Sequence, residues 1–149
     1  MAIVFGPGEG RRLEARGSEM VFKAVAGTTG GRFSLMDRSL PPGGRMPPPH
    51  RHPGTTEAFL VLEGTLAFTI DGDRVEAGPD TFVLVPEGAS HTFGNDGHRA
   101  ARVLIIHAPA LDAYFEDLAA LWRGPDAPDR RVELDLMRRH GLEPVESET

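Results

Sequence analysis

A chain of 149 residues fits one compact domain and leaves no room for a second full one. Its formal net charge is −6, with 22 acidic residues against 16 lysines and arginines, so we expect neither a nucleic-acid nor a membrane partner. The chain contains no cysteine, so any bound metal must be held by nitrogen and oxygen ligands.

The first 19 residues contain four glycines among charged side chains, which indicates an N-terminal arm or a strand-like extension. They lack the long apolar stretch of a signal peptide. No run in the sequence approaches the ~20 apolar residues that a membrane span needs. We therefore expect a cytoplasmic protein.

Residues 20–108 have the pattern of a barrel or sandwich built from short strands. Asp71-Gly72 is a strong hairpin signal, and the loop 41–49 is so rich in proline that it can be neither helix nor central strand. The expected strands are 20–26, 32–40, 57–62, 65–70, 73–77, 81–85, 90–93 and 99–106. Their aromatic residues are expected in the core, namely Phe33, Phe59, Phe68, Phe82 and Phe93.

Residues 109–149 predict a C-terminal helical extension packed on the barrel. Apolar residues from Leu111 to Trp122 fall at helical intervals, and we expect this stripe to pack on a barrel flank rather than to cover a site. A second helix should run from Asp129 to His140, with Gly141 as its cap. The last residues, 142–149, are expected to be frayed.

Two multi-residue motifs place histidines and a glutamate at fixed spacing. They are Gly44-x5-His50-x-His52-x4-Glu57-x6-Gly64 and Pro86-x-Gly88-x2-His91-x3-Asn95. Residues two apart in a strand face the same side, so His50 and His52 can present both imidazoles to one point. In content, order and separation, the motifs resemble the two motifs of the cupin family.

The resemblance implies an all-β fold, a double-stranded β-helix (jelly-roll) barrel, here followed by two C-terminal α-helices. It also implies that His50, His52, Glu57 and His91 hold one divalent metal ion per chain. Three imidazoles and a carboxylate suit Fe, Ni, Mn, Co or Zn, and an octahedral ion would keep two open positions. One position departs from the family pattern, because Asp80 stands where the second motif usually has a glycine.

Strand alternation suggests which side chains share the metal side of the barrel. Phe59 has the parity of Glu57, and Phe93 has the parity of His91. His107 alternates with inward positions of its strand and is a further pocket candidate, with Met46 a candidate at the pocket mouth. The remaining histidines have simpler explanations, because His98 lies in a turn and His140 complements a helix C-terminus.

Three classes of function follow from such a site. The first is a dioxygenase-type oxidoreductase that resembles quercetinases and acts on a phenolic or enolic small molecule, with Glu57 as the catalytic base. The second is a non-redox isomerase or polyketide-type cyclase that uses the metal as a Lewis acid. The third is a non-catalytic small-molecule-binding protein. Since such barrels commonly pair, a homodimer is also expected.

Overall fold

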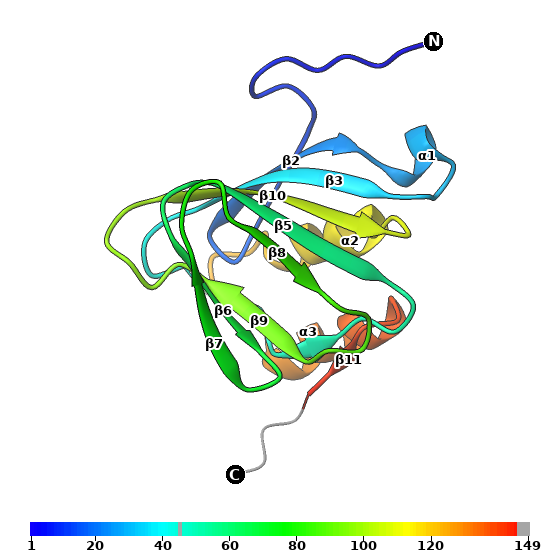
Figure 1. The fold of residues 1–149 in the computed structure, drawn as a ribbon. Helices are drawn as coiled ribbons and strands as arrows, with labels where there is room; N and C mark the ends of the chain where they lie inside the picture. The colour runs from blue at the N-terminus through cyan, green and yellow to red at the C-terminus, as the bar shows by residue number, and fades with distance from the viewer. Residues whose placement is uncertain (45, 146–149) are drawn as a thin grey trace.

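The chain folds into two facing antiparallel β-sheets with helices packed against them (Figure 1). The computed structural model describes residues 1–44 and 46–145. The predicted all-β fold with two C-terminal helices is confirmed. No helix in these described ranges is long and apolar enough to cross a membrane.

The first sheet has six strands in the order β1-β2-β3-β10-β5-β8. Their bounds are β1 Arg11–Ala15, β2 Ser18–Ala24, β3 Ser34–Leu40, β10 Ala101–Ala108, β5 Thr56–Glu63 and β8 Phe82–Val85. Buried and less buried residues alternate along β3 and β10, as in strands with one face turned to a core. β1 pairs with β2, and Arg16 and Gly17, both with positive φ, turn the chain between them. Residues 11–19 therefore belong to this sheet.

The second sheet has five strands in the order β11-β4-β9-β6-β7. Their bounds are β11 Glu143–Pro144, β4 His50–Arg51, β9 His91–Gly94, β6 Leu66–Ile70 and β7 Asp73–Ala77. Asp71 and Gly72 both have positive φ (48° and 85°), the geometry that a tight hairpin between β6 and β7 requires.

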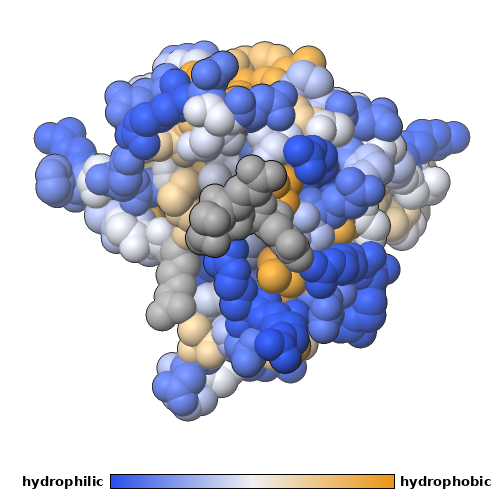
Figure 2. Space-filling model, turned by 90° about the horizontal axis from the view of Figure 1, so that it is seen from below, coloured by the Kyte–Doolittle hydropathy of each residue, from blue (hydrophilic) through white to orange (hydrophobic). Residues whose placement is uncertain are grey.

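Three helices accompany the sheets in the part of the chain that the structure describes. The short α1 (Ala26–Thr29), which the sequence pattern did not predict, lies between β2 and β3. The predicted helices are α2 (Asp112–Leu121) and α3 (Arg130–Arg139), the latter capped by the Asp129 side chain, which accepts from the Arg131 amide at 2.8 Å. The underside of the molecule, where α3 lies in Figure 1, is largely hydrophilic with small apolar patches (Figure 2).

The prediction of a frayed C-terminus is wrong for residues 142–145; residues 146–149 lie outside the described residues. Leu142 is buried, and β11 pairs with β4. The Val145 amide also donates to the Pro49 carbonyl at 2.8 Å. The segment after α3 is thus bound to the strand that carries His50.

The expectation that every strand aromatic lies in the core is wrong for two residues. Phe82 is 61% exposed and Phe33 is 37% exposed, whereas Phe59, Phe68 and Phe93 are buried. The inward positions of β3 are Ser34, Met36, Arg38 and Leu40. Phe33 has the opposite parity, so its ring is turned away from the barrel interior.

Candidate metal centre

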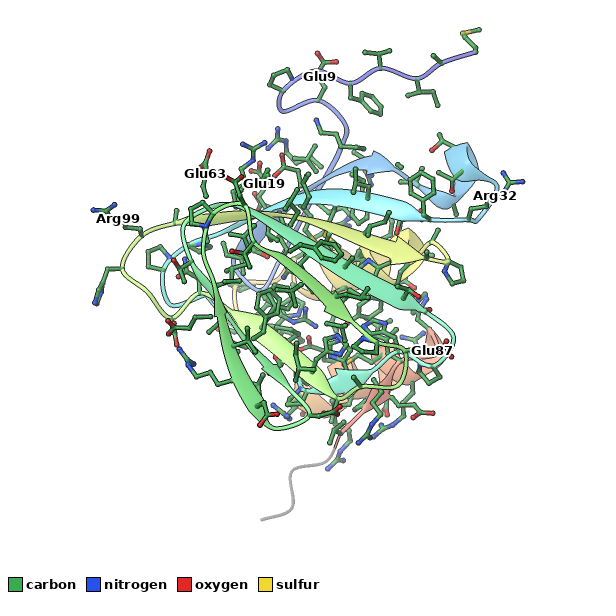
Figure 3. The ribbon with its side chains drawn as sticks, in the orientation of Figure 1. Glu9, Glu19, Arg32, Glu63, Glu87 and Arg99 are labelled. Carbon is green, nitrogen blue, oxygen red and sulfur yellow. The ribbon has the colours of Figure 1, made fainter. Side chains whose placement is uncertain are left out.

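Five ionisable side chains meet inside the barrel, and each is at most 6% exposed. They are His50, His52, Glu57, His91 and His107. Exposed charged side chains such as Glu9, Arg32 and Arg99 instead point away from the barrel (Figure 3). A cluster of this size without exposure to water needs partners for its polar atoms.

Strand register brings these side chains together from both sheets. In the second sheet His50 of β4 lies directly opposite His91 of β9. In the first sheet Glu57 of β5 lies directly opposite His107 of β10. His52 follows β4 by one residue, and its ring centroid lies 4.7 Å from that of His50.

The ring nitrogens and carboxylate oxygens converge closely. His50 Nε2 lies 2.9 Å from His52 Nε2, and His91 Nε2 lies 2.8 Å from Glu57 Oε1. His52 Nε2 is 3.6 Å from Glu57 Oε2, which is also in contact with His107 Nε2. Ligand atoms of two triplets lie within 4.8 Å of one another: His50, His52 and His91, and His52, Glu57 and His107.

Backbone carbonyls fix which nitrogen of two imidazoles faces the centre. His50 Nδ1 donates to the Pro48 carbonyl at 2.7 Å, and His91 Nδ1 donates to the Ala89 carbonyl at 3.0 Å. A neutral imidazole that donates from Nδ1 has its free lone pair on Nε2. Both Nε2 atoms therefore face the centre, where a divalent ion would take the place of the proton that His91 Nε2 donates to Glu57, and the donor set fits a divalent transition metal.

The electrostatics of the cluster also suit a metal. Burial, helped by the positive charge of His91, lowers the pKa of His50 to about 4, and burial lowers the pKa of His52 to about 3. Both imidazoles are thus unprotonated at neutral pH, which metal binding requires. Burial alone would raise the pKa of the Glu57 carboxyl, but His107 and His91 together hold it well below its ordinary value. Burial opposes protonation of His91, yet the Glu57 carboxylate raises its pKa above the ordinary value.

The four residues predicted to line the pocket differ in their positions in the structure. Phe93 and His107 line the cavity beside the cluster. Phe59 instead lies deeper, with its ring packed on those of Phe68 and Phe93 at 4.9 and 5.0 Å between centroids. Met46 does not line this cavity. Its side chain packs over the backbone of Gly94, and Met46 is 45% exposed.

Several cavity residues were not predicted from the sequence. Tyr114 and Phe115 of α2 line the cavity, so the helix stripe reaches the site instead of only covering a flank. Leu142 lines it as well, and so do two buried arginines, Arg16 and Arg38. For Arg38 a signal existed, because it has the parity of Met36 and Leu40 on β3.

Two positions of the motifs have structural explanations. Asp80 has a φ of 64°, so it adopts the left-handed conformation for which the family pattern uses glycine, and aspartate tolerates that conformation better than most residues. Asn95 is buried and closes the turn before β10, since its amide donates to the carbonyls of Leu40 and Arg99.

Comparison with known proteins agrees with this architecture. The sequence model described as "Cupin domain" matches residues 36–107. The chain is 28% identical over 121 residues to quercetin 2,3-dioxygenase of Bacillus subtilis (strain 168), which covers 81% of this chain and 36% of that protein. It is 27% identical over 94 residues to the polyketide synthase CurC of Streptomyces cyaneus, covering 63% of this chain and 61% of that protein.

A solved structure with the same fold is the polyketide cyclase RemF of Streptomyces resistomycificus. It superposes with a TM-score of 0.63 and 22% identity, covering 72% of this chain and 80% of that one. At this identity the likeness concerns the fold alone. The chain spans about a third of the quercetin dioxygenase and under two thirds of the polyketide synthase.

Proposed function

Because this chain contains a domain of the cupin family, we propose that it is a metal-dependent enzyme acting on a small organic molecule, most simply as a dioxygenase-type oxidoreductase. Its phenolic or enolic substrate would bind beside one divalent ion, which can be Fe, Ni, Mn, Co or Zn. The ligands are His50, His52, Glu57 and His91. The observation that carries the proposal is the convergence of unprotonated imidazole nitrogens and a carboxylate in one buried cavity.

A bound ion of this kind supplies Lewis acidity and open coordination positions. The chain's own residues supply a dry cavity and a proton acceptor. Phe93, Phe115 and Leu142 line the cavity and limit the access of water. Glu57 Oε1 or Oε2 would take a proton from a substrate hydroxyl or carbon atom, in competition with the hydrogen bonds from His91 and His107.

The similarity to the Bacillus subtilis quercetin 2,3-dioxygenase favours the redox reaction. A non-redox isomerase or polyketide-type cyclase is the second candidate, supported by the similarity to CurC. A non-catalytic binding protein is the third. One fold hosts all three, so the chemistry of the site must decide.

The deciding experiment is metal analysis of protein purified without a chelating tag, combined with dioxygen uptake on a panel of flavonols. Bound iron, nickel or manganese with substrate-dependent uptake supports the dioxygenase. Bound zinc with no uptake favours the isomerase or cyclase. Protein that takes up none of the five metals would contradict the proposal as a whole.

We further propose a homodimer. Leu60 on β5 and Phe82 and Leu84 on β8 are 37%, 61% and 52% exposed, an unusual density of apolar side chains for two neighbouring strands. Sedimentation at micromolar concentration should give twice the chain mass. A monomer at every concentration would contradict this assembly.

A further inference from the structure

Two buried arginines line the cavity that holds the histidine cluster, and their partners differ. Arg16 lies in the turn between β1 and β2 and is 3% exposed. Its Nε donates to Glu133 of α3 at 2.7 Å, and its NH2 group donates to the Tyr114 hydroxyl at 3.2 Å. The charge of Arg16 is therefore neutralised by a carboxylate.

Arg38 on β3 has no such neutralisation. It is 2% exposed, its Nε donates to the Ser18 hydroxyl at 2.9 Å, and its guanidinium lies 5.4 Å from the centre of the Phe93 ring. Within residues 1–44 and 46–145 it forms no ion pair with a carboxylate. With Nε engaged, the paired terminal nitrogens remain available to a ligand in the cavity.

The guanidinium of Arg38 is charged at neutral pH. Burial, together with the positive charge of Arg16, lowers the pKa of Arg38 to about 9, which still leaves it almost fully protonated at pH 7. An unpaired buried cation is costly, so its retention calls for a compensating anion.

The charges around the cavity show when that anion is needed. Apart from the histidines, the buried charged side chains among the described residues are Arg16, Arg38, Glu57 and Glu133, and their charges cancel. A divalent ion on the histidines and Glu57 would add two positive charges. The negative charge of Glu57 would then serve the metal, and Arg38 would be left without compensation.

We propose that Arg38 is a substrate-binding residue and that the cavity takes a small organic carboxylate. This inference rests on the proposed metal site and narrows its substrate class. The terminal nitrogens of a guanidinium match the two oxygens of a carboxylate, which can accept two parallel hydrogen bonds. Phe93, Ile105 and Phe115 provide apolar walls for the rest of the molecule.

The test measures binding directly and does not depend on turnover. Metal-loaded protein is titrated by calorimetry with formate, acetate and benzoate, and with formamide, acetamide and benzamide as neutral partners of the same shape. At least one carboxylate should bind ~10-fold or more tightly than its amide, the scale of a charge-assisted hydrogen bond.

Two substitutions assign this selectivity to Arg38. R38M should bind carboxylate and amide within about threefold of each other while keeping its metal content. R102M is the matched control, because Arg102 on the neighbouring strand β10 pairs with Asp37 and is absent from the cavity lining. It should retain the selectivity. If R38M fails to fold, R38Q keeps a donor for Ser18 without the charge and is expected to behave in the same way.

Two results would overturn the inference. One is metal-loaded wild-type protein that binds no carboxylate more tightly than its amide. The other is selectivity that persists in folded R38M or R38Q, since the metal alone would then account for it. Failure of the proposed function would be recognised separately, as wild-type protein that binds no metal.

Discussion

The barrel interior has two parts of opposite character. In one part the rings of Phe59, Phe68 and Phe93 pack together, with centroids 4.9 to 5.8 Å apart. In the other part, four histidines and a glutamate fill a comparably buried space. Phe93 belongs to both, because its ring packs on the aromatic cluster and lines the cavity.

The two parts affect folding differently. Burying aromatic rings removes apolar surface from water and stabilises the fold. Burying imidazoles and a carboxylate costs desolvation energy that their mutual hydrogen bonds only partly offset. The polar part is therefore best explained by what it binds, and the two parts should respond separately to substitution.

The largest expected effect is loss of the metal from His91→Ala. Removing one nitrogen ligand from a four-residue set should reduce the content from about one ion per chain to near zero. His98→Ala is the matched control, since His98 is exposed, and it should remain loaded. Elemental analysis of both proteins measures the difference. Full occupancy in His91→Ala would remove this residue from the ligand set.

In the aromatic part, Phe68→Ala should lower the free energy of unfolding by ~3 to 5 kcal/mol, because it leaves a cavity beside two other rings. Metal content per folded chain should stay unchanged. The exposed Phe82 offers the control, and Phe82→Ala should change stability by less than ~1 kcal/mol. Urea titration measures both. Coupled loss of metal in folded Phe68→Ala would show that the two parts are not separable.

Within the polar part, Glu57→Gln separates metal binding from catalysis. The three remaining histidines should hold most of the metal, while turnover on the true substrate should fall at least ~10²-fold, the scale of a lost general base. Glu63→Gln, on the same strand but exposed, is the control. A metal-replete and nearly fully active Glu57→Gln would show that another group accepts the proton.

The sequence predicted strands β2, β3 and β5 to β10 and the two long helices because alternating and helical periodicities are local signals. It also predicted that histidines and a glutamate from the two motifs would meet, since both motifs have fixed spacing. Asp80 shows how a departure from a motif can still satisfy its geometry, because its positive φ supplies the turn that glycine usually makes.

These local patterns do not predict long-range packing. The pairing of β11 with β4 depends on where α3 ends in space, and nothing local in Glu143–Pro144 indicates a strand. The expected core position of Phe33 has the opposite parity to Arg38, so it did not indicate that Arg38 faces inward.

The smallest expected effect is the pH dependence of the metal-free protein. His50 and His52 have pKa values of about 4 and about 3 in the folded state, below the ordinary histidine value of 6.5. As pH falls below 6.5 the unfolded chain binds more protons than the folded one, so stability falls until the folded imidazoles titrate. His91 acts in the opposite sense: its pKa is raised, so its contribution is complete below 6.5 and is lost as pH rises. Stability should therefore drop between pH 6.5 and pH 4.5, measured as the urea midpoint. In the double variant H50Q/H52Q most of this loss of stability should disappear. If the stability of the metal-free wild-type protein does not change between pH 6.5 and 4.5, these imidazoles are protonated as readily in the folded chain as in the unfolded one.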